Sequence, residues 1–136
     1  MAHEAPGTTT KASLPRQFRL IRLELAREPK HPDGSRQHGY RLVAPLDSQD
    51  RIDAELWKDH REACRVVRFR PGEDEDIGHL VHKGKATWAF HYDVRGDQKD
   101  ETGFRFGDER FIIGEYVSLR EDGGLHTFMV TAVEHL

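Results

Sequence analysis

The chain has 136 residues, of which 36% are hydrophobic and 33% charged, and its formal net charge is −3. This length corresponds to one ordinary domain, which can bury a core without disulfides or metal ions. The negative charge gives no electrostatic argument for a nucleic-acid or membrane partner, and the single cysteine excludes an intramolecular disulfide. Residues 1–14 are rich in Ala, Gly, Thr and Pro and predict a disordered tail before one domain at 15–136. Because no secretory signal and no membrane-spanning apolar run is present, we expect a cytoplasmic protein.

The first predicted unit is a β-hairpin. In residues 17–29 the apolar alternation breaks partway, which indicates a strand that twists or changes partner and leaves a helix open as the alternative. The turn-forming residues Pro, Asp and Gly follow within 30–39. Residues 40–46 then return as a second strand, with Tyr40 and Leu42 on one face.

Residues 46–63 predict the one helix of the chain. Ser48 or Asp50 can cap its start, and acidic residues gather in the first turn. We expect about three turns that plug one end of a sheet or barrel. The predicted apolar stripe consists of Ile52, Leu56 and Ala63, with Trp57 at its edge.

From Cys64 onward the pattern predicts strands and turns only. Trp88, Phe90 and Tyr92 share one strand face and are expected in the core, whereas residues 95–103 are interpreted as a loop. With about six or seven strands and one short helix, the fold class is mainly β, a small antiparallel β-barrel or rolled sheet. The predicted strands and hairpins lie in 64–70, in 78–94 with a turn at 83–85, and in 115–136 with a turn at Asp122-Gly123-Gly124.

Three histidines in the hairpin at 78–94 raise the question of a metal site. His79 and His82 fall on opposite faces of a strand because side chains alternate. If the hairpin turns at Lys-Gly-Lys, His91 lies across from His79 as a cross-strand pair. A carboxylate from Asp93 or Glu115 could complete a site, since zinc takes three or four protein ligands. Histidines that only decorate the hairpin are the alternative.

Two other groups of side chains suggest chemistry. His60 and Cys64 stand four residues apart, which on a helix would place imidazole beside thiol, although a packed core thiol is the alternative. Five arginines could line one sheet face beside aromatic rings, as in barrels that bind single-stranded nucleic acid, with a salt-bridged solvated face as the alternative. These are Arg19, Arg22, Arg65, Arg68 and Arg70.

Some segments resemble known proteins. The sequence GEYVSL at 114–119 is similar to a strand of the flavin-binding barrel of ferredoxin reductases, but the Arg-x-Tyr-Ser segment that contacts flavin there is missing. The histidine spacing departs from the His-x-His of cupin barrels. The sequences GYRLVAPLD, VVRF and GEYVSLREDGGLHTFMV resemble small uncharacterised bacterial domain families, a resemblance that implies no known activity.

These observations favour a non-enzymatic binding module for a protein partner or small ligand, without a cofactor. Phosphate-loop and catalytic-triad signatures are absent. A homodimer would pair the uncovered edge of a rolled sheet. The alternatives are a metal-dependent enzyme that uses rim histidines and a single-stranded nucleic-acid binder. The predicted ligand site at the barrel rim comprises His79, His91, His126, Arg68 and Arg70, and the metal candidates are His79 and His91.

Overall fold

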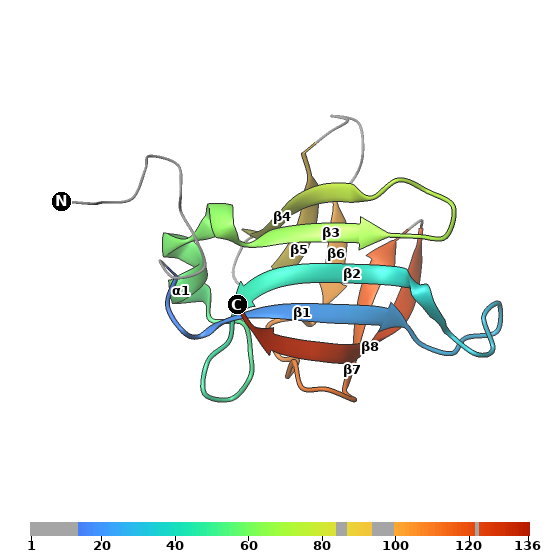
Figure 1. Cartoon of the computed structure of the whole chain (residues 1–136), viewed down its shortest axis with the longest axis horizontal. Helices are drawn as coiled ribbons and strands as arrows, with labels where there is room; N and C mark the ends of the chain where they lie inside the picture. The colour runs from blue at the N-terminus through green and yellow to red at the C-terminus, as the bar shows by residue number, and fades with distance from the viewer. Residues whose placement is uncertain (1–13, 84–86, 94–99, 122) are drawn as a thin grey trace.

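A computed structural model describes residues 14–83, 87–93, 100–121 and 123–136. They form a closed antiparallel barrel in which each strand pairs with the next and β1 pairs with β8 (Figure 1). The predicted class is confirmed, but the barrel has eight strands rather than six or seven. Closure removes the free edge on which the expected homodimer depended. The strands are β1 Phe18–Leu25, β2 Ser35–Pro45, β3 Arg65–Phe69, β4 Asp76–Lys83, β5 Thr87–Tyr92, β6 Glu101–Phe104, β7 Tyr116–Glu121 and β8 Gly124–His135.

The broken alternation in β1 corresponds to two irregularities in its pairing. Its register against β8 shifts between Arg22 and Leu23, and its register against β2 shifts between Glu24 and Leu25. An extra residue in one strand of a pair bends that strand and increases its twist. The prediction of a strand rather than a helix is therefore confirmed.

The helix begins later than expected and is shorter. Helix α1 spans Ala54–Asp59 and is followed by the 3-10 turn η2 at Arg61–Ala63. Its N-cap is Asp53, whose side chain accepts hydrogen bonds from two backbone amides of the first turn, so the prediction of Ser48 or Asp50 is wrong. The preceding residues instead form a turn closed by the β-bridge between Leu46 and Ile52. Within the described part of the chain, no helix is long and apolar enough to cross a membrane.

Helix α1 covers one end of the barrel, as predicted, through Trp57. The indole ring of Trp57 packs edge-on against Trp88 at 5.3 Å and against His82 at 5.7 Å between ring centroids. Its Nε1 donates a hydrogen bond to the backbone oxygen of Leu80 at 2.9 Å. The predicted apolar stripe is therefore wrong about which side chain of the helix is buried, because that residue is Trp57 and not Leu56.

Strand β6 was missed because its segment was interpreted as a loop. It has four residues and pairs with β5 and β7, and so it completes the barrel. Glu101, at its start, is buried. Short polar strands do not show an alternation long enough to separate them from loops.

Large side chains fill the barrel interior. An eight-stranded barrel is just wide enough for its own side chains to occupy the middle. The expected core trio of Trp88, Phe90 and Tyr92 is confirmed, since all three are buried. The ring of Tyr40 lies 5.1 Å from that of Phe90, so the strands pack directly across the interior. The largest fully buried residues are Trp88, Tyr40, Phe18, Phe90, Phe106, Phe111, Phe128, Ile21, Leu23, Leu42, Leu80 and Leu119.

The close approach of β1 and β2 depends on Gly39. A Cβ atom at this position would lie 1.9 Å from the backbone oxygen of Leu23 and 3.0 Å from the ring of Phe69. We expect Gly39→Ala to lower the free energy of unfolding by about 1–3 kcal/mol, as overpacking does. Urea denaturation measures this loss, with Gly124→Ala as the control, because a Cβ there meets nothing closer than 3.4 Å. Equal losses in both variants would contradict the steric explanation.

Candidate functional site

Two of the predicted site residues, Arg68 and Arg70, lie at the barrel end opposite α1. This end, here called the mouth, carries the β1–β2 and β3–β4 connections, on the right in Figure 1. Arg68 pairs with Asp76 at 3.1 Å and with Glu101 at 3.5 Å. Arg70 pairs with Glu121 at 3.1 Å. The two guanidinium groups are therefore engaged by buried or half-buried carboxylates of the mouth.

The mouth also contains side chains that the sequence did not point to. Glu121 accepts hydrogen bonds from the hydroxyl of Tyr40 and contacts Nε2 of His38 at 2.9 Å. The carboxyl group of Glu101 lies within hydrogen-bond distance of two hydroxyl groups, that of Tyr40 at 2.9 Å and that of Tyr92 at 2.5 Å. Glu121 follows the buried positions of β7 in alternation, so its inward direction was detectable in the sequence. No comparable signal pointed to Glu101.

Burial and neighbours change the pKa values in the mouth in opposite directions. Burial alone would raise the pKa of Glu121, but hydrogen bonds from His38 and Tyr40 and the charge of Arg70 lower it to about 2. Burial raises the pKa of Glu101 above its usual range, despite the hydrogen bond from Tyr92 and the charge of Arg68. Burial and the nearby carboxylates also raise the pKa of Tyr40, so its hydroxyl stays protonated as a donor.

His79 and His91 form the predicted cross-strand pair, and they lie on the outer face of β4 and β5. The register pairs them directly. His79 contacts Asp93 at 2.9 Å, whereas His91 contacts Asp100 at 2.7 Å, so each imidazole has its own carboxylate. Both histidines border a hollow of about 370 Å³ beside Trp57. Among the residues the structure describes, no three His, Cys, Asp or Glu side chains are arranged to hold a metal ion.

His126 does not join the other predicted rim histidines. It lies on β8 and bonds through Nδ1 to Glu28 of the β1–β2 connection at 3.1 Å. Because three strand steps separate β5 from β8 around the barrel, His126 and His91 belong to different faces. The structure thus divides the predicted rim site into an outer pair and a residue near the mouth.

The paired thiol and imidazole suggested by the sequence are also separated. Cys64 is fully buried, and burial raises the pKa of its thiol to about 12. The ring of His60 packs edge-on against Phe18, and its Nδ1 contacts the backbone oxygen of Leu56 at 3.0 Å. A buried neutral thiol is a packing residue, not a nucleophile.

The suggested arginine face does not exist as one surface. Arg68 is buried inside the mouth, whereas the neighbouring Arg65 points outward and pairs with Asp93. On β1, the guanidinium of Arg22 lies 4.4 Å above the ring of Phe69 on the outer wall. Odd and even positions of β3 point to opposite sides, so the five arginines could not share one face.

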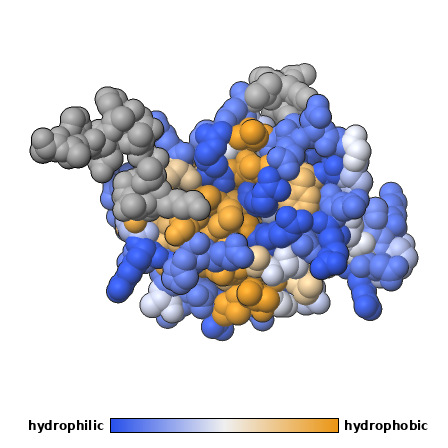
Figure 2. Space-filling model, viewed as in Figure 1, coloured by the Kyte–Doolittle hydropathy of each residue, from blue (hydrophilic) through white to orange (hydrophobic). Residues whose placement is uncertain are grey.

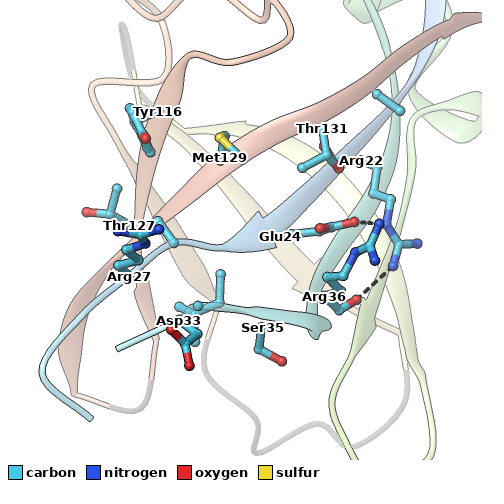
Figure 3. Close-up of a pocket in the computed structure, with 14 residues that line it drawn as sticks. Arg22, Glu24, Arg27, Asp33, Ser35, Arg36, Tyr116, Thr127, Met129 and Thr131 are labelled. Atoms are coloured by element: carbon cyan, nitrogen blue, oxygen red, sulfur yellow. Dashed lines mark hydrogen bonds and ion pairs between the residues drawn. The ribbon is translucent and has the colours of Figure 1, made fainter. Parts of the chain in front are cut away.

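A second hollow, here called the outer groove, lies on the outside of the barrel and measures about 920 Å³. Figure 3 shows it between the wall built by β1 and β8 and the start of β2, with Arg27 at one end and Arg22 and Arg36 at the other. Figure 2 shows that the face of the molecule seen in Figure 1 is mostly hydrophilic and that apolar side chains form patches on it. The groove is lined by Arg22, Glu24, Leu25, Ala26, Arg27, Asp33, Gly34, Ser35, Arg36, Tyr116, Thr127, Met129, Thr131 and Ala132.

The charges along the outer groove are only partly balanced. Arg22 donates from Nε to Glu24 at 2.7 Å and from Nη2 to the backbone oxygen of Arg36 at 2.9 Å. Arg27 and Arg36 are exposed, and no ion pair of either side chain occurs among the residues described. Asp33 is the other charged residue of the lining. Two exposed guanidinium groups therefore face one exposed carboxylate.

No protein-family model, curated protein or solved structure matches this chain. The resemblances to the flavin-binding barrel and to small bacterial domains thus rest on the quoted segments alone.

Proposed function

We propose that this protein is a non-enzymatic binding module and that its partner is an extended, acidic protein segment bound in the outer groove. One observation carries the proposal: exposed Arg27 and Arg36 lie at opposite ends of a groove of about 920 Å³. Guanidinium groups bind carboxylates with paired hydrogen bonds. A segment with carboxylates spaced along its length matches this arrangement.

The barrel architecture favours an outer site over an inner one. Because large side chains such as Trp88 and Tyr40 fill the interior, a ligand enclosed in the barrel would have to displace them. A partner also cannot add a strand, since the closed barrel offers no free edge. Recognition has to use side chains on the outer wall, and the groove provides them.

The lining also supports a protein segment rather than a small molecule. Sites for small ligands are concave and bury most of the ligand surface. The outer groove is bordered by exposed residues, among them Tyr116, which is 58% exposed. Aromatic side chains and Arg are enriched where proteins bind one another, and Met129 adds an apolar contact between them.

The two alternative functions have less support from the geometry. The His79–His91 pair brings each imidazole to a separate carboxylate. Single-stranded nucleic-acid binding required several arginines on one face, and Arg68 and Arg65 lie on opposite sides of β3. A cytoplasmic location remains part of the proposal and is supported by the single buried, unpaired cysteine.

Arg27→Gln and Arg36→Gln are expected to weaken binding of a glutamate-rich peptide. Exposed ion pairs contribute about 0.2–1 kcal/mol each, so each variant should bind up to about five-fold more weakly, with a larger loss in the double variant. The measurement is a titration followed by backbone amide NMR shifts. We expect shifts that cluster on β1, β8 and the start of β2 and that decrease at high salt.

Two controls make this experiment specific. A peptide with glutamine in place of glutamate should bind more weakly. Arg110 is an exposed arginine outside the groove lining, so the Arg110→Gln variant should bind the glutamate-rich peptide as tightly as the unchanged protein does. Amide shifts confined to the mouth, or equal affinity in the Arg27→Gln/Arg36→Gln double variant, would overturn the proposal. Groove shifts caused by a small dicarboxylate, with none from the peptide, would assign the groove to a small ligand instead.

A further inference from the structure

A continuous hydrogen-bonded chain runs from the mouth into the barrel. It starts at His38, whose Nε2 contacts Oε1 of Glu121 at 2.9 Å. The other oxygen of Glu121 bonds to the hydroxyl of Tyr40, and that hydroxyl lies 2.9 Å from Oε1 of Glu101. The chain ends at Tyr92, whose hydroxyl lies 2.5 Å from the same oxygen of Glu101.

The Tyr40 hydroxyl stands between two carboxyl groups but carries a single proton. It can donate to Glu121 or to Glu101, not to both at once. If both carboxyl groups were ionised, one of the two contacts would place oxygen lone pairs against each other. A proton on Glu101 removes this conflict, because Glu101 then donates to Tyr40 while Tyr40 donates to Glu121.

The charges around Glu101 lead to the same conclusion. Arg68 of β3 and Arg70, which follows β3, pair with Asp76 of β4, Glu101 of β6 and Glu121 of β7. Among the contacts of the described residues, Glu121 has both Arg70 and His38 as partners, whereas Glu101 has Arg68, which also pairs with Asp76. A buried carboxyl group with fewer cationic partners holds its proton more tightly, so the proton belongs on Glu101 rather than on Glu121.

In the described part of the chain, the remaining elements around Glu101 supply no other cation at its carboxyl group. Strand β2 contributes Tyr40 and His38, and His38 contacts Glu121 rather than Glu101. Strand β5 contributes the neutral donor Tyr92. Strand β8 contributes Phe128, whose ring lies 5.9 Å from that of His38.

We propose that Glu101 is a buried proton-binding site that keeps its proton to a higher pH than an exposed glutamate does, which makes the barrel mouth sensitive to pH. When this proton leaves, the mouth gains a negative charge beside Arg68, which already pairs with Asp76. The chain through Tyr40, Glu121 and His38 provides the path between Glu101 and solvent. The opposite pKa directions of the two carboxyl groups, raised at Glu101 and lowered at Glu121, agree with one proton retained on Glu101.

The expected pH dependence follows from the raised pKa of Glu101. Since the folded protein holds this proton more tightly than the unfolded chain, the protonated group favours folding at low pH. That contribution is lost as the pH rises from the unfolded value of about 4.3 through the folded pKa. Glutamine imitates the protonated acid, so Glu101→Gln should remove the loss.

Infrared spectroscopy of the whole chain tests the proposal directly. As the pH rises, we expect the carbonyl band of a protonated carboxylic acid to persist after the exposed carboxyl groups have ionised, and this persisting band should be absent from the Glu101→Gln spectra. The unfolding free energy of the unchanged protein should fall relative to that of Glu101→Gln as the pH rises. A missing band, a band that persists in Glu101→Gln, or parallel stability profiles would each overturn the proposal.

A second variant keeps the proposal testable if Glu101→Gln does not fold. Tyr92→Phe removes a donor that stabilises ionised Glu101, so the carboxylic acid band should persist to higher pH than in the unchanged protein. Asp93→Asn is the matched control, because Asp93 lies on the outer face beside His79. If the carboxylic acid band of the Tyr92→Phe variant disappeared at the same pH as that of the unchanged protein, this result would contradict the assignment of the band to Glu101.

Discussion

Replacing Glu121 with glutamine is expected to lower the free energy of unfolding by about 3–5 kcal/mol at neutral pH, as breaking a buried ion pair does. The carboxylate is 1% exposed and accepts contacts from Arg70, His38 and Tyr40. An amide keeps the shape but not the charge, so the half-buried guanidinium of Arg70 would lose its ion pair with Glu121. Urea denaturation followed by circular dichroism measures the loss.

The low-pH part of the plot of unfolding free energy against pH, here called the acid limb, provides an independent check on Glu121. The difference between the ordinary value of 4.5 and about 2 in the fold corresponds to about 3 kcal/mol. Because this pKa is lowered, the contribution is present above the unfolded value and is lost as the pH falls toward about 2. Glu121→Gln should flatten this limb, whereas Glu134→Gln, an exposed control, should not. A normal acid limb in Glu121→Gln would contradict the role of Glu121.

Trp88→Ala is expected to cost about 3–5 kcal/mol, the range for removing a large aromatic residue from a core. Trp88 is 2% exposed. The ring of His82 is stacked on it at 4.1 Å, and Trp57 of α1 meets its face edge-on. The substitution therefore opens a cavity beneath the helix that closes the barrel. Urea denaturation gives the loss of stability.

The fluorescence of Trp57 shows whether the helix loses its packing. Only two tryptophans are present, so the emission of Trp88→Ala comes from Trp57 alone. We expect this emission to shift toward that of a solvent-exposed indole. Trp88→Phe retains an aromatic ring under the helix and should lose less stability. Emission of Trp57 that stays typical of a buried indole in Trp88→Ala would show that Trp88 does not hold the helix.

The strands that were predicted well are those in which polar and apolar residues alternate over many positions. In β2, Tyr40 and Leu42 are buried together, as their spacing predicted. The hairpin of β4 and β5 has the predicted register, which pairs His79 with His91. Of its expected turn at 83–85, only Lys83 is described, and it ends β4. Of the tail expected at 1–14, only Leu14 is described, and it packs against the core, so the tail was predicted one residue too long. Asp122 of the last hairpin also lies outside the described residues. Local periodicity and hairpin pairing are properties of neighbouring residues, so the sequence contains them directly.

The errors occur where local pattern is weak. The predicted helix is longer than the observed one because acidic residues occur throughout 47–55, and several of them could act as a cap. Only Asp53 has an extended backbone with its side chain on the amides of the first turn. The outer groove was not predicted at all, because it depends on the register shifts of β1 and on where residues 26–34 lie relative to the wall.

By itself, the sequence determined that the protein is mainly β, that one helix closes an end of it and which face of most strands is apolar. These features follow from alternation, capping and turn residues within a few positions of each other. Only the tertiary structure decided that eight strands close into a barrel and that Glu101 and Glu121 meet at Tyr40. The physical reason is that a strand's own pattern defines its two faces, whereas closure decides which side chains from distant strands share one interior.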